Sequence, residues 1–157
     1  MKAMVLERIS PVAETPLRLI DLPDPVPGPG EIRVRVRACG VCRTDLHVVE
    51  GDLPELTLPI IPGHQIVGDV DALGSGASAF TPADRVGVAW LRGTCGACAY
   101  CRRADENLCP DSRYTGYHEN GGYAELAVVP EKFAYRIPDQ FDELQAAPLL
   151  CAGIIGY

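Results

Sequence analysis

Residues 31–47 read EIRVRVRACGVCRTDLH. In the first half of this stretch, apolar side chains alternate strictly with arginines, and this period of two predicts a strand with one buried and one solvated face. The solvated face explains the three arginines, and a binding patch is the alternative. The second half places a thiol, a hydroxyl, a carboxylate, an imidazole and a guanidinium together. The stretch therefore predicts a half-buried strand that ends in chemically active side chains.

Cys42 is a candidate metal ligand, because thiolate and imidazole groups are the usual protein ligands of zinc. Its partners must come from elsewhere in the chain, and His64 and Cys151 are the best candidates. Two cysteines and one histidine leave the fourth tetrahedral position for water or substrate, which is typical of catalytic zinc. The alternative is that both cysteines are small buried hydrophobic residues and His64 is a loop residue. The spacing alone leaves both interpretations open.

The composition is that of an ordinary folded domain. The chain has 157 residues, 47% of them hydrophobic and 22% charged, which suits one domain with a full core. No apolar run approaches the roughly 20 residues of a membrane span, so we expect no membrane partner. The net charge of −7 disfavours a nucleic-acid partner, because nucleic-acid binding needs a basic face.

In the N-terminal stretch MKAMVLE, a charged residue interrupts the apolar segment too early for a signal peptide. This predicts a cytoplasmic protein. In a reducing compartment, the seven cysteines are expected to be ligands or catalysts rather than disulfides.

Short strands separated by turns are expected through most of the chain. Beside the strand at 31–39, the pattern predicts strands at 1–6, 17–21, 66–73, 85–90, 123–129 and 132–137. Four prolines between 23 and 29 predict an extended connector, and residues 51–63 an ordered loop that delivers His64. Residues 139–147 form the first segment expected to be helical, with Asp139 as its N-cap. Together these elements predict a mainly β domain, a mostly antiparallel barrel or sandwich.

The strongest motif is a four-cysteine cluster with the spacing C-x2-C-x2-C-x7-C. It comprises Cys95, Cys98, Cys101 and Cys109. Four thiolates can close a tetrahedron on one ion, which predicts a structural zinc site in a lobe with little apolar material. An iron–sulfur cluster is the alternative, because Pro110 follows the last cysteine as in C-x2-C-x2-C-x3-C-P, although the last gap here is longer. A zinc-ribbon nucleic-acid module and four free thiols are weaker alternatives.

The series of motifs resembles the zinc-dependent alcohol dehydrogenases of the medium-chain dehydrogenase/reductase family. The matching stretches are CGVCRTDLH at 39–47, PGH at 62–64, the four-cysteine lobe, GGYAE at 121–125 and CAG at 151–153. The resemblance implies that residues 1–157 form a GroES-like catalytic domain, an irregular antiparallel barrel with short helices and a zinc-stabilised lobe. It also implies two zinc ions per chain, a catalytic zinc on Cys42, His64 and Cys151 and a structural zinc on the four-cysteine lobe.

The resemblance assigns roles to further residues. Thr44 and His47 would relay the alcohol proton to solvent, since a hydroxyl both donates and accepts. Asp45 would orient His64 by a hydrogen bond and raise its basicity, and a capping carboxylate is the alternative. Arg43, together with His47, would contact the cofactor, whose pyrophosphate suits a guanidinium. Trp90 would narrow the substrate pocket, or it belongs to the core.

Three departures from the family pattern are visible. Gln65 stands where the family usually has glutamate after the ligand histidine, and Ile155 stands where many relatives have a threonine beside the nicotinamide. No G-x-G-x-x-G motif follows a strand, so the nucleotide-binding Rossmann domain is expected outside residues 1–157.

The function that the resemblance implies is the oxidation of an alcohol to an aldehyde or ketone, or the reverse, with hydride transfer to NAD or NADP. The partner would be a small-molecule alcohol or aldehyde, and the full-length enzyme would form homo-oligomers. The isolated fragment is expected to be inactive without the cofactor's domain. The alternatives are a zinc-binding structural module without turnover and an iron–sulfur electron carrier.

Overall fold

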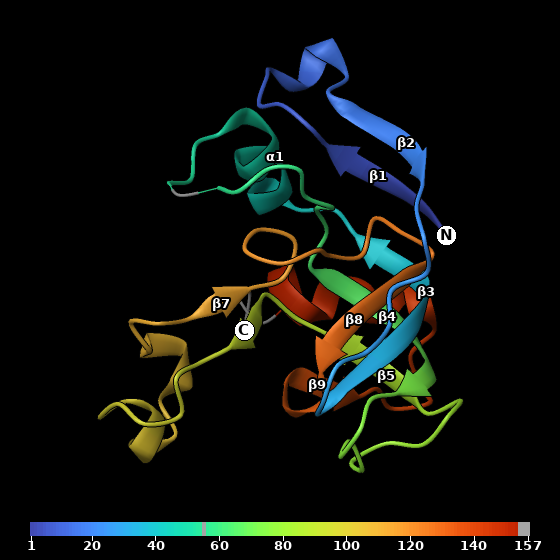
Figure 1. The fold of residues 1–157 in the computed structure, drawn as a ribbon, viewed down its shortest axis with the longest axis vertical. Coiled ribbons are helices and arrows are strands. Elements are labelled where there is room, and N and C mark those ends of the chain that lie inside the picture. Colours follow the sequence, from blue (N-terminus) through green and yellow to red (C-terminus); the bar gives the residue numbers. More distant parts are fainter. Residues whose placement is uncertain (55, 154–157) are drawn as a thin grey trace.

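The computed structural model describes residues 1–54 and 56–153 (Figure 1). Within these residues, the strands are β1 (Lys2–Leu6), β2 (Leu17–Asp21), β3 (Glu31–Gly40), β4 (Gln65–Leu73), β5 (Arg85–Val88), β6 (Leu91–Gly93), β7 (Arg113–Tyr114), β8 (Leu126–Pro130) and β9 (Ala134–Arg136). Two α-helices, α1 (Arg43–Glu50) and α2 (Glu143–Pro148), are accompanied by short 3-10 turns and by a π-helical turn, η5 (Leu149–Gly153). The expected mainly β fold is confirmed.

The centre of the domain is an antiparallel sheet with the strand order β8-β3-β4-β5-β9. Two small antiparallel sheets flank it, β1-β2 and β6-β7. One face of the central sheet carries the largest hydrophobic cluster, in which Ile32, Val34, Ile66 and Val86 are fully buried. Burial of such aliphatic side chains contributes about 1.5–3 kcal/mol each, so this cluster is the main stabilising core.

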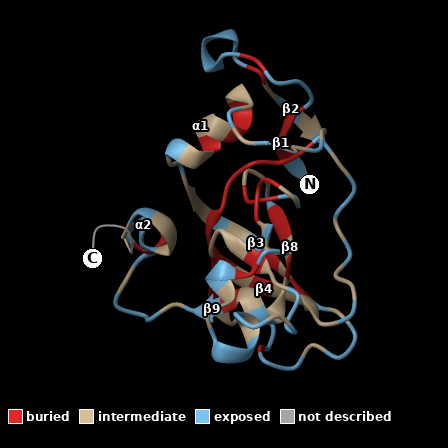
Figure 2. Ribbon diagram, turned by 90° about the vertical axis from the view of Figure 1, so that its left-hand side faces the viewer, coloured by how far each residue is buried: buried red, intermediate tan, exposed pale blue. Residues whose placement is uncertain are grey.

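Part of the opposite face of the central sheet is covered by α2, which packs against β3 and β4 (Figures 1 and 2). Because side chains alternate along a strand, Val67 points away from the core that Ile66 enters and meets Ala146 and Ala147 of α2. The small alanines allow the helix to lie close to the sheet. This packing brings the segment after α2 against β4.

The arginines of β3 form a ladder of ion pairs on the solvated face, as the alternation predicts. Arg33 and Arg35 both bind Asp71, with shortest N–O distances of 2.6 and 2.8 Å, and Arg37 binds Asp69 at 2.7 Å. The hydrogen bond from Arg35, with that from Arg33, holds the pKa of Asp71 below its usual value. The alternation of the strand and the ion pairs with Asp69 and Asp71 account for these arginines, so no binding patch is needed to explain them.

Helix α1 was not expected from the sequence. Its eight residues include β-branched and polar side chains of modest helix propensity, so local propensity predicts no helix there. The helix exists because Cys42 takes the N-cap position, where its sulfur accepts from a backbone N–H, and because Asp45 completes a capping box. The capping box was not recognised in the sequence because its N-cap residue is a cysteine rather than the usual serine or threonine.

The expected boundaries at the C-terminal end are wrong in several places. The helix begins at Glu143 with Asp142 as its N-cap, not at 139 with Asp139, because the Asp142 side chain accepts from the Gln145 N–H. Strand β8 starts at Leu126 rather than 123. A 3-10 turn at Glu131–Phe133 precedes β9, which covers only 134–136.

Strand β5 ends at Val88, so Trp90 lies in a bend before β6 and not in the expected strand 85–90. The short pair β6 and β7, which closes the base of the four-cysteine lobe, was also missed. Strands of two or three residues contain too few side chains for an alternation to be seen.

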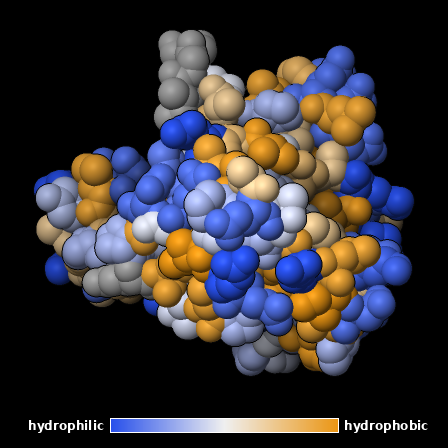
Figure 3. Space-filling view, turned by 90° about the horizontal axis from the view of Figure 1, so that it is seen from above, coloured by the Kyte–Doolittle hydropathy of each residue, from blue (hydrophilic) through white to orange (hydrophobic). Residues whose placement is uncertain are grey.

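No helix in the described part of the chain is long and apolar enough to cross a membrane. Seen from above, hydrophobic side chains lie in separate groups between hydrophilic ones (Figure 3). Single exposed apolar residues of this kind, such as Leu19 and Val12, are normal on a protein surface and need no ligand.

Candidate metal centres

The register of the central sheet brings Cys42 and His64 together. Gly40, the last residue of β3, pairs with Gln65, the first residue of β4. Cys42 follows the end of β3 and His64 precedes the start of β4, so the two side chains meet at the same end of this strand pair. The distance from Cys42 Sγ to His64 Nε2 is 3.3 Å.

Cys151 reaches the same point from η5, the π-helical turn that follows α2. The ligand atoms of Cys42, His64 and Cys151 all lie within 4.8 Å of one another. His64 is 1% exposed, while both cysteines are half-buried. Burial, and then the nearby Cys42 thiol, raise the pKa of Cys151. Two soft sulfur atoms and one imidazole that converge in this way fit a zinc ion with one position left for another ligand.

Asp45 links the start of α1 to His64. Its Oδ2 accepts from the Cys42 backbone N–H at 2.8 Å, and its Oδ1 lies 3.2 Å from His64 Nδ1. The two interpretations of Asp45, a cap and a partner of His64, therefore hold at once. The imidazole tautomer that donates from Nδ1 to Asp45 leaves the Nε2 lone pair facing Cys42.

Thr44 and His47 lie three residues apart on α1 and so on the same side of the helix. The Thr44 backbone N–H donates to Cys42 Sγ at 3.3 Å, which places the backbone of this residue beside the candidate ligand. His47 Nδ1 lies 2.8 Å from Asp52 Oδ2. The contact of Asp52 with His47 was not expected from the sequence. The signal for it is a carboxylate directly after Gly51, the C-cap of α1. Arg43 is exposed at the first turn of the helix.

Trp90 stands at the centre of an aromatic group next to His64. The indole meets the His64 ring edge-on at a centroid distance of 4.9 Å. It stacks nearly parallel to Tyr114 at 4.8 Å and to Tyr117 at 5.8 Å. His118 in turn stacks on Tyr114 and contacts Tyr117 in a tilted arrangement. Trp90 is thus both packed against a core cluster and adjacent to the candidate ligand, and its tyrosine supports were missed in the sequence.

Gln65, the departure from the family pattern, follows His64 directly and is 1% exposed. Its Oε1 lies 2.2 Å from where a Cβ on residue 40 would stand, so Gly40 must be glycine for this side chain to fit. Its Nε2 is buried without a hydrogen-bond partner within the described residues. The other departure, Ile155, lies outside the described residues.

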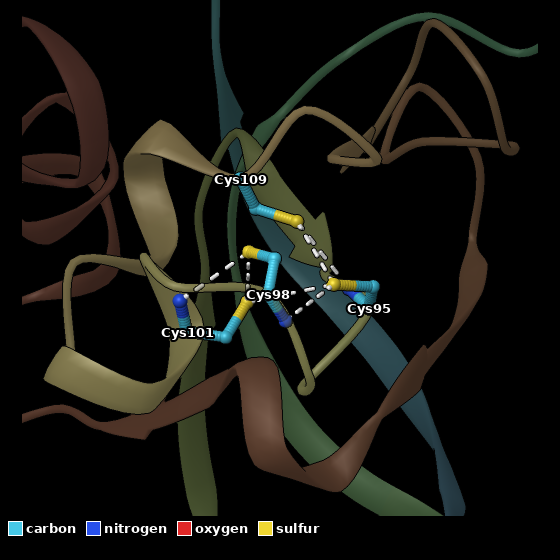
Figure 4. A group of neighbouring side chains, drawn as sticks. All are labelled: Cys95, Cys98, Cys101 and Cys109. Atoms are coloured by element: carbon cyan, nitrogen blue, oxygen red, sulfur yellow. Dashed lines mark hydrogen bonds between the residues drawn. The ribbon is translucent and has the colours of Figure 1, made fainter.

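The four-cysteine lobe extends away from the rest of the domain between β6 and β7 (Figure 1). Figure 4 shows the four sulfur atoms turned toward a common point. Their separations are 3.9 Å for Cys95–Cys101, 3.5 Å for Cys98–Cys101 and 3.6 Å for Cys95–Cys109. Sulfurs bound to one zinc at about 2.3 Å in a tetrahedron lie roughly 3.8 Å apart, so these spacings fit a single ion.

Backbone N–H groups surround the thiols of the lobe. The N–H groups of Cys95, Cys98 and Cys101 donate to the sulfurs of Cys109, Cys95 and Cys98. The donation from Cys101 lowers the pKa of the Cys98 thiol to about 7, whereas burial raises that of Cys101 to about 11. Between residues 94 and 112, Cys109 is the one buried residue, and the lobe has no hydrophobic core.

Comparison with known proteins agrees with this geometry. Residues 28–139 match the family of the alcohol dehydrogenase GroES-like domain. The probable alcohol dehydrogenase AdhA of Mycobacterium tuberculosis is 54% identical over 162 residues, which cover 100% of this chain and 47% of the relative. The chain thus spans about half the length of the curated relatives that it matches.

Two solved structures are closely similar. An NAD-dependent alcohol dehydrogenase superimposes with a TM-score of 0.88 and 36% identity, over 96% of this chain and 43% of that one. A cobalt- and zinc-bound thermostable alcohol dehydrogenase from Pyrobaculum aerophilum superimposes with a TM-score of 0.85 and 34% sequence identity, over 95% of this chain and 44% of that one. With two candidate metal centres on a matching fold, the chain belongs to the GroES-like domain family of the medium-chain alcohol dehydrogenases.

Proposed function

We propose that residues 1–157 are the catalytic domain of a zinc-dependent alcohol dehydrogenase, which converts an alcohol to an aldehyde or ketone, or the reverse. The observation that carries the proposal is the convergence of the Cys42, His64 and Cys151 ligand atoms within 4.8 Å. Alcohol dehydrogenation by the relatives and neighbours named above supports the same activity for the protein that contains this domain.

Cys42, His64 and Cys151 would hold the catalytic zinc. When bound, the ion would supply Lewis acidity that lowers the pKa of the substrate hydroxyl. Asp45 holds His64 by the contact with Nδ1, and this second partner keeps the imidazole oriented and raises its basicity. The aromatic group around Trp90 borders His64 and would limit the width of the substrate pocket.

The substrate proton would leave through side chains of α1. The Thr44 hydroxyl can accept a proton from the substrate and donate its own onward, and His47 can receive it on the same side of the helix. Asp52 Oδ2 lies 2.8 Å from His47 Nδ1 and orients the ring. His47 is 34% exposed, so the proton can pass from there to water.

NAD or NADP would accept the hydride. We assign the nucleotide-binding Rossmann domain to sequence outside residues 1–157, since the relatives are about twice as long. Arg43 is exposed one residue after Cys42, where its guanidinium, with His47, can meet the cofactor. The protein would be cytoplasmic and form homo-oligomers, and the seven free cysteines agree with a reducing compartment.

Cys95, Cys98, Cys101 and Cys109 would hold a second, structural zinc. An iron–sulfur cluster spreads its four cysteines over several irons, whereas these four sulfurs all lie within 4.8 Å of one another. The spacing therefore supports a single ion over the electron-carrier alternative. The remaining alternative from another class is a zinc-binding module without turnover.

The test is a chimera that joins residues 1–157 to the remaining half of the Mycobacterium tuberculosis relative. We expect the chimera to reduce NAD or NADP with a small alcohol, and residues 1–157 alone to bind metal without turnover. His64→Ala in the chimera should abolish the rate while the four-cysteine lobe keeps its metal. A chimera that loads two metals but has no activity, or one whose rate survives His64→Ala, would overturn the proposal.

A further inference from the structure

His118 is one of three histidines in the chain, and neither the candidate metal centres nor the proposed proton relay uses it. It lies in the turn that follows β7. The Tyr114 backbone N–H donates to His118 Nδ1 at 3.2 Å, and the His118 N–H donates to the Tyr114 carbonyl at 3.1 Å. An imidazole nitrogen accepts only through its lone pair, so Nδ1 is unprotonated in this arrangement. The side chain and the main chain of His118 therefore both bind Tyr114.

The imidazole also packs against two tyrosine rings. Its centroid lies 5.4 Å from that of Tyr114 and 4.3 Å from that of Tyr117. Tyr117 is 6% exposed and belongs to a hydrophobic cluster with Leu6 of β1 and Val48 of α1. His118 thus holds one tyrosine by hydrogen bonds and ring contact, and it packs on a second tyrosine that the core fixes.

Both tyrosines lie against the Trp90 indole, which borders His64. The interplanar angle with the indole is 14° for Tyr114 and 18° for Tyr117. Aromatic rings stacked in this way attract one another beyond the area that they bury, so each tyrosine restricts the tilt of the indole. The indole in turn meets the His64 ring edge-on at 4.9 Å. The wall that Trp90 forms beside His64 therefore depends on two rings that His118 contacts.

The backbone of the turn is fixed at the same two places. The Thr115 N–H donates to the Trp90 carbonyl at 2.9 Å. Gly116 has φ +73°, and a Cβ there would lie 2.8 Å from the Gly63 backbone nitrogen, so the turn packs directly on the residue before His64. Because the backbone is held in this way, loss of the His118 side chain is expected to free the neighbouring rings and leave the main chain in place.

We propose that His118 is a positioning residue that sets the width of the substrate pocket. Through Tyr114 and Tyr117 it holds the Trp90 indole beside His64 and keeps the pocket narrow. The ligand that fits such a pocket is a small, unbranched alcohol, because a fixed indole excludes branched chains. The inference rests on the proposed function, since it concerns an alcohol bound next to His64.

The first experiment is acrylamide quenching of tryptophan fluorescence in the metal-loaded chain. Trp90 is the one tryptophan in the sequence, so the signal reports on this side chain alone. His118→Ala removes the ring and the acceptor, and it should raise the quenching constant. His118→Asn should raise it less, because the amide oxygen can accept in place of Nδ1. A quenching constant of His118→Ala equal to that of the parent would contradict the inference.

The second experiment measures specificity in the chimera of residues 1–157 with the remaining half of the Mycobacterium tuberculosis relative. The readout is kcat/KM for isobutanol divided by kcat/KM for ethanol. We expect His118→Ala to raise this ratio about tenfold, as for a methyl-sized change in an apolar pocket, with both metals retained. Arg113→Gln is the matched control, because it removes only an exposed ion pair with Glu119 near the same turn. Its ratio should equal that of the parent.

A double-mutant cycle tests whether His118 acts through Trp90. In the Trp90→Ala chimera, His118→Ala should raise the ratio no further. An equal rise in both backgrounds, or a His118→Ala ratio within about twofold of the parent, would overturn the inference while leaving the proposed function intact. A parent chimera that loads two metals but has no activity would overturn both.

Should His118→Ala lose its fold, which loss of the lobe metal would reveal, nitrogen NMR of the metal-loaded parent decides. An unprotonated His118 Nδ1 that is coupled to the Tyr114 N–H supports the arrangement. A protonated Nδ1 contradicts it.

Discussion

The three-donor cluster and the four-cysteine lobe gather similar ligand atoms on very different supports. Cys42, His64 and Cys151 come from three distant segments, and the central sheet, α1 and α2 bring them together. The four cysteines of the lobe come from residues 95–109, and Cys109 is the one buried residue between 94 and 112. At the first centre the fold positions the ligands, whereas at the second a metal bound by the ligands would stabilise the fold of the lobe.

This difference predicts different roles for the metals that the two centres would bind. A site that the fold preforms can lose its ion and keep its shape, and it can leave one position for a substrate. A lobe without a core gains its folding free energy from the metal that its thiolates bind. Substitutions that remove one site and leave the other test whether the two centres differ in this way.

The largest effect is expected from Cys101→Ser in the lobe. Loss of one of four thiolates should release that metal and unfold residues 94–112, because no hydrophobic core remains to hold them. Hydrogen exchange measured by mass spectrometry should show full loss of protection there and unchanged protection in β3 and β4. The matched control is Cys151→Ser, which removes a thiol from the other centre and should leave the lobe protected. A protected lobe in Cys101→Ser would show that the lobe folds without its metal.

The next effect concerns chemistry rather than folding. In the chimera, Thr44→Val keeps the size of the side chain and removes the hydroxyl that is proposed to relay the proton. We expect kcat to fall by about 10²-fold or more, as for other proton-transfer groups, with two metals still bound. Thr81→Val, at an exposed threonine far along the chain, is the control. An unchanged kcat would remove Thr44 from the relay.

A smaller effect is expected at Asp45, which contacts His64 without contacting the metal. Asp45→Ala should weaken zinc binding at the three-donor centre by about 10–100-fold and leave the lobe unaffected. Glu50→Ala on the same helix is the control, since that carboxylate accepts from the Val12 N–H. The role of Asp45 would be abandoned if its variant and the control bound zinc equally well in competition with a chelator.

The smallest effect is expected in the sheet that supports the first centre. Hydrogen bonds from Arg35 and Arg33 hold the pKa of Asp71 below its usual value, so its ionised form stabilises the fold. That stability is present above the unfolded pKa and is lost as pH falls through the folded pKa. At pH 7, Asp71→Asn should lower the free energy of unfolding by about 0.2–1 kcal/mol. Urea unfolding should show this difference shrinking below about pH 4, and a constant difference would contradict the assignment.

The sequence was most informative where the pattern is long or dense. The alternation at 31–39 predicted β3 and its solvated arginines, and the cysteine spacing predicted the lobe. The ligand role of His64 depended on the family resemblance, because its proximity to Cys42 follows from the register of β3 and β4, which no local pattern reveals.

Local chemistry explains the other differences. Helix α1 was missed because a cysteine takes the N-cap position and because its residues have modest helix propensity. Asp139 and Asp142 both precede the apolar segment, and only the side-chain contact with Gln145 marks Asp142 as the N-cap. The aromatic group around Trp90 joins residues 90, 114 and 117, whose stacking depends on the turn between β7 and β8.

The most direct test of two centres on one domain is metal counting by native mass spectrometry. We predict two zinc ions in the parent chain, one in His64→Ala, one in Cys101→Ser and none in the double variant. Two zinc ions retained in His64→Ala, or iron in place of zinc in the parent, would contradict the account.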